Sequence, residues 1–325
     1  TIKQKLNITR VDTASEALAL SLAEKAGIDI PYVTDLTGKD EATLVEELRG
    51  VIFQLPDMAD HEGHPIYVTA DEYLSGNVRK KLRQAEQAAN ADPQFRSNVE
   101  ALKAVQPVDL TASEISVRLG ATWLPPEDVA RFLFELFDTP GYARYNIKVH
   151  YSKLTGTWNI EGKSYDRSSV KANSTYGTNR INGYKIIEET LNLKDVRIFD
   201  YVEDAEGHKT AVLNKKETAI AQSKQQLIKQ AFADWIWKDP ERRERLCKLY
   251  NETFNSVRPR EYDGSHLNFV GINPEIKLRP HQVNAIAHIL YGGNTLLAHV
   301  VGAGKTFEIV AAAQESKRLG LCSKS

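Results

Sequence analysis

Residues 294–313 read NTLLAHVVGAGKTFEIVAAA, and this stretch decides most of what the sequence says about fold. The apolar run at 294–298 predicts a short strand, and the apolar residues from Phe307 onward recur with helical spacing. Between them lies a glycine-rich segment that ends in Gly-Lys-Thr at 304–306. A strand, a glycine loop of this kind and a helix together make up a phosphate-binding loop.

Each residue type in this loop has a chemical reason. Gly302 and Gly304, with Ala303 between them, allow backbone N–H groups to turn toward phosphate oxygens where a larger side chain would clash. Lys305 is expected to reach the β- and γ-phosphates, and the hydroxyl of Thr306 is expected to bind Mg²⁺. The sequence therefore predicts ATP and Mg²⁺ as cofactors, with Lys305 and Thr306 as catalytic residues.

One position departs from the strict loop pattern. His299 stands where that pattern has its first glycine, separated by four residues from the final Gly-Lys-Thr. Loops shortened in this way are typical of superfamily-2 helicases and their translocase relatives.

A second motif lies about twenty residues upstream. The residues from Leu278 to Gln282 read Leu-Arg-Pro-His-Gln and open a helix that continues through Leu290. This resembles the Leu-Arg-Pro-Tyr-Gln element of Swi/Snf-type superfamily-2 ATPases, with His281 in place of the tyrosine. The resemblance implies that Gln282 contacts adenine, through one donor and one acceptor of its amide, and that Arg279 belongs to the nucleotide site.

The flanking text extends the resemblance. Residues 232–237, 250–255 and 262–267 resemble very large bacterial helicase-related proteins of phages and conjugative elements. Such proteins often join a DNA methyltransferase to a helicase, which implies DNA, the remaining helicase lobes and a methyltransferase region as partners. The string at 273–276 lacks the methyltransferase motif Asn/Asp-Pro-Pro-Tyr/Phe, so we expect any methyltransferase region upstream of Thr1.

Composition sets limits on the chain of 325 residues. Lys and Arg number 42 against 43 Asp and Glu, so only local clustering of charge could bind nucleic acid or a membrane. Two cysteines, no signal peptide and no long apolar run predict a soluble, cytoplasmic protein. The start at Thr1, with Met58 as the single methionine, predicts a segment of a longer protein. We expect the acidic Asp-Glu pair and second-lobe arginines of the motor to follow Ser325.

The N-terminal quarter predicts three short helices. Thr13 with Glu16 forms a capping box, a second helix spans 30–36, and Asp40 caps a third. A helical packing module is favoured here over a helix-turn-helix DNA reader because no basic recognition face occurs. The following loop, 55–65, contains His61 and His64 beside carboxylates, and a solvated loop is favoured over a metal site.

A cluster of cations follows in a helical stretch. Arg79, Lys80, Lys81 and Arg83 could meet DNA phosphates, although a solvated helix face is the favoured interpretation. Further along, alternation predicts a strand at 115–119, and Pro125-Pro126 predicts a helix start. The remaining expected elements are hairpins at 146–160 and 196–213, a polar loop at 164–180, and helices at 217–237 and from Pro240.

The predicted fold class is mixed α+β: a mostly helical accessory region with small antiparallel hairpins, then the truncated start of a RecA-like α/β domain. The predicted regions are 1–110 (helical accessory), 111–215 (α+β with hairpins), 216–260 (helical connector) and 261–325 (truncated first ATPase lobe).

Three functions remain open at this stage. The leading one is part of an ATP-dependent DNA helicase or translocase that carries the nucleotide-binding elements but not the rest of the motor. The second is a nucleic-acid-binding or docking module without ATPase activity, suggested by the cations at 79–83 and the aromatic, polar stretch at 165–180. A nucleotide kinase or GTPase is the third, and the Leu278–Gln282 element argues against it.

Overall fold

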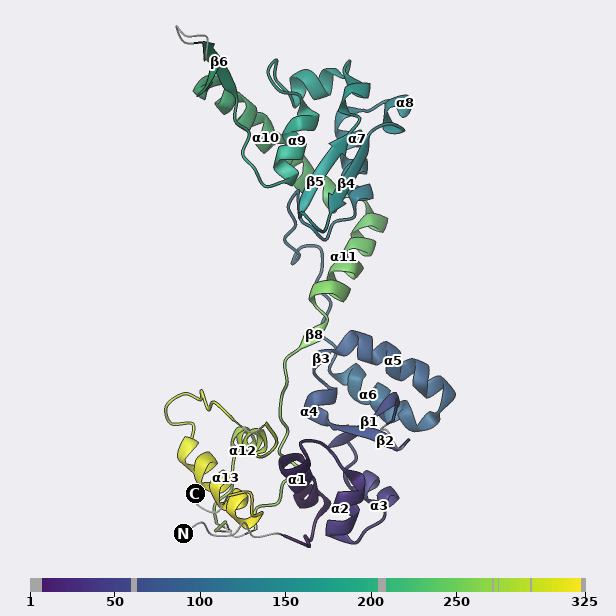
Figure 1. The fold of residues 1–325 in the computed structure, drawn as a ribbon, viewed down its shortest axis with the longest axis vertical. Coiled ribbons are helices and arrows are strands. Elements are labelled where there is room, and N and C mark those ends of the chain that lie inside the picture. The colour runs from purple at the N-terminus through teal and green to yellow at the C-terminus, as the bar shows by residue number, and fades with distance from the viewer. Residues whose placement is uncertain are drawn as a thin grey trace. The chain divides into compact units, whose positions relative to one another are not determined.

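The computed structural model describes residues 8–59, 63–203, 209–270, 272–273, 275–292 and 294–322. Contacts between residues divide the chain into two compact units (Figure 1). Unit 1 contains Thr1–Val108 and Ser256–Ser325, and unit 2 is Asp109–Asn255. About half of the residues are helical, and the strands of the described part form antiparallel two-stranded sheets. The mixed helical character with small hairpins is therefore confirmed.

Unit 1 begins with three helices and a hairpin. These elements are α1 (Ala14–Lys25), α2 (Ile30–Thr37), α3 (Glu41–Glu47), β1 (Ile52–Ala59) and β2 (Pro65–Thr69). Thr13 and Glu16 form the predicted capping box, and Asp29 and Asp40 cap α2 and α3. The apolar faces of the three helices meet in one core around Leu18, Leu36 and Leu44. The predicted helices of this segment are confirmed.

The hairpin corrects the predicted loop at 55–65. β1 continues through Ala59 and β2 starts at Pro65, because Ile52 and Phe53 pair with Thr69 and Val68 and draw the two segments together. Asp60, His61 and Glu62 of the metal hypothesis lie outside the described residues. Among the residues that are described, no group of three His, Cys, Asp or Glu side chains could hold a metal ion.

The rest of unit 1 comes from both ends of the chain. Its elements are α4 (Ala70–Tyr73), β3 (Gly76–Asn77), α5 (Val78–Ala91), η1 (Pro93–Phe95), α6 (Arg96–Ala104), β8 (Val257–Arg258), α12 (Pro280–Gly292) and α13 (Lys305–Arg318). Helices α12 and α13 pack against each other around Ile286 and Ala311. The end of α13 reaches the N-terminal core, where Leu319 is buried and the Arg318 guanidinium lies 2.6 Å from the Glu16 carboxylate.

Unit 2 has one larger core. Its elements are α7 (Pro126–Phe137), α8 (Gly141–Arg144), β4 (Lys148–Ser152), β5 (Thr157–Glu161), η2 (Lys163–Asp166), η3 (Lys171–Thr175), α9 (Gly183–Leu191), β6 (Phe199–Glu203), β7 (Lys209–Leu213), α10 (Lys215–Ile236) and α11 (Pro240–Phe254). Phe132, Trp158, Tyr184 and Phe232 lie in this core. Both predicted hairpins, the helix start at Pro126 and the helix capped by Asp239 are confirmed.

Several local predictions are wrong. Residues 115–119 and 294–298 are irregular and not strands, because no neighbouring strand of the described chain pairs with them. The polar stretch 164–180 contains helical turns as well as loop.

Two further predictions have a different status. The four consecutive regions, and the RecA-like character of the last one, stay predictions. None of the described helices combines the length and the apolar character that a membrane-spanning helix needs.

Candidate nucleotide-binding site

The glycine loop lies at the start of α13, as the sequence predicts for this segment. Gly302 and Gly304 have φ values of +85° and +91°, in the left-handed region that favours glycine. The ammonium of Lys305 donates to the carbonyl oxygens of His299 and Val300, at 2.7 and 3.1 Å. The loop therefore curves around the end of its own lysine.

Several backbone donors at this helix start are unused. The N–H groups of Gly304, Lys305 and Thr306 donate to no acceptor among the described residues, and Gly304 provides no side-chain cap. The first N–H groups of a helix always need partners from outside the helix, and they carry its positive dipole end. An anion such as phosphate fits this set of donors.

Gln282 connects α12 to the loop. Its side chain is buried, and its amide oxygen accepts from the N–H of Arg279 at 2.8 Å, which caps α12. Its amide nitrogen donates to the carbonyl of Gly304 at 3.2 Å. Both ends of the amide are thus used within the protein, so contact with adenine would require exchange of these bonds. Arg279 itself contributes its backbone, and its side chain is exposed.

A buried carboxylate under the loop was missed by sequence reasoning. Glu308, in the first turn of α13, is fully buried, and its carboxylate lies 2.9 Å from the Nδ1 atom of His299. His281 approaches from α12, and its Nε2 atom lies 2.9 Å from the carbonyl oxygen of Ala303. Since a carbonyl only accepts, Nε2 of His281 carries the hydrogen in this contact. The signal in the sequence was His299, which stood where a glycine was expected.

The outer face of α13 is apolar and exposed. Phe307, Ile309 and Val310 are 51%, 56% and 61% exposed. A RecA-like domain would bury these side chains against a parallel sheet, and among the described residues the sheets are antiparallel pairs. The inner face, by contrast, packs Ala311 and Ala312 against α12.

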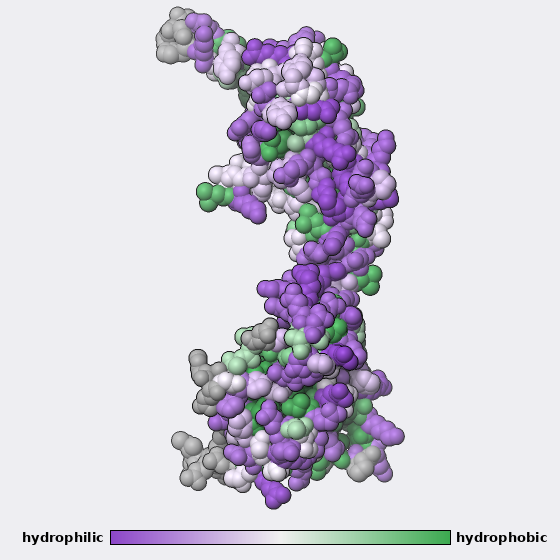
Figure 2. Space-filling view, turned by 90° about the vertical axis from the view of Figure 1, so that its right-hand side faces the viewer, coloured by the Kyte–Doolittle hydropathy of each residue, from purple (hydrophilic) through white to green (hydrophobic). Residues whose placement is uncertain are grey.

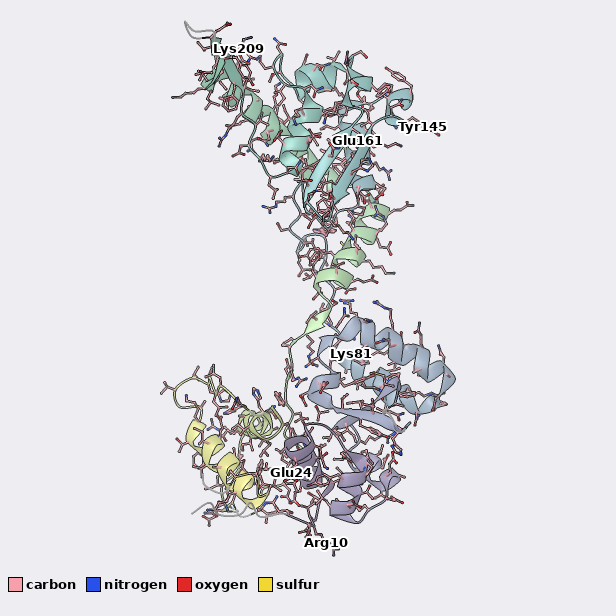
Figure 3. The ribbon with its side chains drawn as sticks, in the orientation of Figure 1. Arg10, Glu24, Lys81, Tyr145, Glu161 and Lys209 are labelled. Carbon is pink, nitrogen blue, oxygen red and sulfur yellow. The ribbon has the colours of Figure 1, made fainter. Side chains whose placement is uncertain are left out.

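The four cations of α5 have different surroundings. The ammonium of Lys81 donates to the carbonyls of Glu72, Tyr73 and Ser75, all within 2.9 Å, and burial lowers its pKa. Arg79 donates to the carbonyl of Pro107 at 3.2 Å. Lys80 and Arg83 are exposed. The prediction that this run binds DNA stays a prediction, and Lys81 additionally has a structural role (Figure 3).

Two segments of the chain match known family models. Residues 10–62 match a model described as "Probable helicase, winged helix domain". This segment is similar to a helicase winged helix. Residues 118–256 match a domain of unknown function, DUF8437. Each match covers less than half of the chain, and no curated protein or solved structure matches.

The winged-helix match suggests a helicase-related protein with a DNA-binding role. The order of three helices followed by a hairpin agrees with it. The match therefore favours the helix-turn-helix alternative that the sequence analysis placed second. Helix α3 nevertheless offers no basic face for DNA, because it carries Glu41, Glu46 and Glu47.

Proposed function

We propose that this chain is part of an ATP-dependent DNA helicase or translocase of the superfamily-2, Swi/Snf-like type. The observation that carries the proposal is the start of α13, where a left-handed glycine pair leaves three consecutive N–H donors without an acceptor in the described chain. The winged-helix match at residues 10–62 supports the helicase relation independently. The other helicase lobes, and a methyltransferase region in the same parent protein, belong to this proposal.

The residues around the loop fit a nucleoside triphosphate. The amides of Gly304, Lys305 and Thr306 would hold phosphate oxygens, and the Lys305 ammonium would leave its two carbonyl partners for the phosphates. The exposed hydroxyl of Thr306 would bind Mg²⁺. Bound Mg²⁺ would neutralise charge on the transferring phosphoryl group. Gln282 would hold the loop against α12 and read adenine.

An alternative is a nucleic-acid-binding module that has no ATPase activity of its own. The exposed apolar face of α13 favours it, because a working lobe covers this face with a sheet. The two functions differ in whether the loop binds nucleotide.

Calorimetric titration with MgATP tests the proposal. We expect the wild-type chain to bind MgATP. The affinity of Lys305→Ala should be lower by a factor of about ten or more, since a charge-assisted contact is lost. Lys317→Ala, at the other end of α13, is the matched control and should bind as the wild type does. No binding by the wild type, or equal binding by Lys305→Ala, would favour the alternative. Equal affinity for ATP and GTP would contradict an adenine-reading role for Gln282.

A further inference from the structure

Formal charge is distributed very unevenly along this nearly neutral chain. Residues 10–62, the winged-helix segment, contain four cations and twelve carboxylates, a net charge of −8. Residues 139–187 of unit 2 contain eight cations and two carboxylates, a net charge of +6. Because affinity for nucleic acid depends mainly on cations that neutralise phosphates, the second segment is the better candidate for a nucleic-acid surface.

The details of α3 strengthen this contrast. Lys39 and Arg49, the cations that flank α3, pair with Glu47 and Glu46. A helix at the recognition position would then bring carboxylates toward the phosphates of a duplex, which costs affinity. Binding of nucleic acid by this chain therefore needs another surface.

Half of the cations in 139–187 are already paired with carboxylates. Lys163 and Lys185 bind Glu188, Lys171 binds Asp138, and Arg180 binds Asp200. The other four, which form no ion pair with any described residue, are Arg144, Lys148, Lys153 and Arg167. Three of these four fall within ten residues, from α8 to the turn of the β4–β5 hairpin.

The structure places a groove at this position. It has a volume of about 780 Å³ between α7, α8 and β4, and Arg144, Lys148 and His150 line one side. The Arg144 guanidinium is held by the carbonyl of Thr139 at 2.6 Å and lies over the ring of Phe134. The α7 side contributes Glu135, which Arg131 and the indole N–H of Trp235 already engage, and Glu127. The cationic side is therefore formed by α8 and β4.

Exposed aromatic rings stand next to these cations. Tyr142 is 65% exposed and Tyr145, at the end of α8, is 85% exposed (Figure 3). Such rings offer faces on which unpaired bases stack, a contact that the bases of a duplex do not offer. The side of unit 2 on which α8 lies is mostly hydrophilic (Figure 2), which argues against an apolar protein partner there.

We propose that α8 and the outer face of the β4–β5 hairpin bind single-stranded nucleic acid. Lys148 and Lys153 contact phosphates, Arg144 lines the groove beside them, and Tyr142 and Tyr145 stack on bases. Glu161 opposes the interaction: it lies across from Lys148 on β5, and its carboxylate is 3.8 Å from His150. The proposal goes beyond the proposed function, because it assigns a separate site in a domain of unknown function.

Fluorescence anisotropy with a labelled single strand of about 20 thymidines tests the proposal, using the full chain without nucleotide. The affinity of the double variant Lys148→Glu/Lys153→Glu should be lower than that of the wild type by a factor of about ten or more. The slope of log affinity against log salt should fall by about 1.4, for two lost phosphate contacts. The affinity of Tyr145→Ala should be lower than that of the wild type by a factor of about five or more. Glu161→Gln, which removes a repelling charge, should bind more tightly than the wild type.

The matched control is Lys238→Glu/Lys248→Glu, which makes the same charge change elsewhere on unit 2 and should leave binding unchanged. Circular dichroism spectra should be the same for all variants. Equal losses in the control and the test variant, tighter binding of duplex than of single strand, or equal binding of polyglutamate would each overturn the proposal. Comparing the affinities for single-stranded DNA and single-stranded RNA shows which of the two this surface prefers. The same measurement with Lys305→Ala separates this site from the nucleotide loop. This variant should bind the single strand as the wild type does, even if the loop binds no nucleotide.

Discussion

At the scale of single residues, the side chain of Gln282 packs directly against the backbone of Gly304 in the candidate loop. The φ value of Gly304 is +91°, and a Cβ atom added there would lie 2.3 Å from the amide nitrogen of Gln282. A Cβ atom added at Gly302, where φ is +85°, would meet nothing within 4 Å. The two glycines therefore serve different purposes, backbone conformation alone at Gly302 and close approach of α12 as well at Gly304.

We predict that Gly304→Ala destabilises unit 1 more than Gly302→Ala does. Backbone strain costs each variant about 1–2 kcal/mol, and Gly304→Ala additionally displaces Gln282 from its hydrogen bonds. Chemical denaturation without nucleotide measures the difference in the free energy of unfolding. Adding Gln282→Ala to Gly304→Ala should recover the part that comes from the clash. If both single variants lose the same stability, the close approach at Gly304 has no energetic role.

Glu188 predicts a pH dependence for unit 2. Burial would raise the pKa of this carboxyl, but hydrogen bonds from the Ile160 N–H and from Lys163 and Lys185 outweigh burial and lower its pKa to about 2. A lowered pKa in the folded state means that the carboxylate stabilises the fold above its ordinary pKa, and that this contribution disappears as the pH falls from about 5 toward 2.

Glu188→Gln should therefore cost on the order of 2–3 kcal/mol at neutral pH and almost nothing near pH 2. Thermal denaturation from neutral to acidic pH measures this difference. Glu189→Gln is the control, since its more exposed carboxylate shares Lys185 but should cost under about 1 kcal/mol. A constant difference across the pH range would contradict the assignment to Glu188.

At the scale of elements, α5 illustrates how a sequence pattern can combine two roles. Lys81 closes the turn between α4 and β3 by donating to three carbonyls, and its ammonium also lies over the ring of Tyr73. Lys80, one residue earlier, is exposed. In the sequence, both belong to the same cluster of cations.

We expect Lys81→Met to destabilise unit 1 by about 1–3 kcal/mol, because the partly buried carbonyls of Tyr73 and Ser75 lose this donor. Lys80→Met should change stability by less than about 0.5 kcal/mol. Hydrogen exchange at residues 72–76 and chemical denaturation check both values. A DNA-binding test of this helix should therefore change Lys80 and Arg83 only, because Arg79 also donates to a backbone carbonyl. Equal stabilities of the two Met variants would remove the reason for sparing Lys81.

At the scale of the whole molecule, the proposed ATPase needs groups for hydrolysis as well as groups that hold a nucleotide. In the described chain, the carboxylate beside the loop is Glu308, which is fully buried and engaged by His299. Hydrolysis needs an acidic residue that holds Mg²⁺, a positioned water and an opposing arginine, all in place at once.

We predict that the 325-residue chain does not hydrolyse ATP above the background rate of Lys305→Ala. The loss of several charge-stabilising groups together lowers turnover by many orders of magnitude. Release of inorganic phosphate, followed with and without single-stranded DNA, is the measurement. Turnover by the wild type that disappears in Lys305→Ala would show that the chain contains a complete catalytic site.

The sequence by itself determined the elements that depend on local chemistry. Capping residues such as Thr13, Asp40 and Asp239 begin helices through hydrogen bonds from residues three positions further on, so their effect is visible in a short window. The left-handed backbone at Gly302 and Gly304 is local in the same sense, while the phosphate-binding role of this loop stays a prediction. The strands at 115–119 and 294–298 were mispredicted because a strand requires a partner, which no local pattern reveals.

Only the tertiary structure decided which distant groups meet. Glu308 lies under the loop because α13 turns its inner face toward α12, and Gln282 reaches Gly304 across that same contact. Arg245 of α11 binds Asp128 of α7, and Lys81 caps a turn instead of facing solvent. Burial and long-range pairing depend on the approach of elements far apart in the chain, and the free energy of those contacts has no signature in the local sequence.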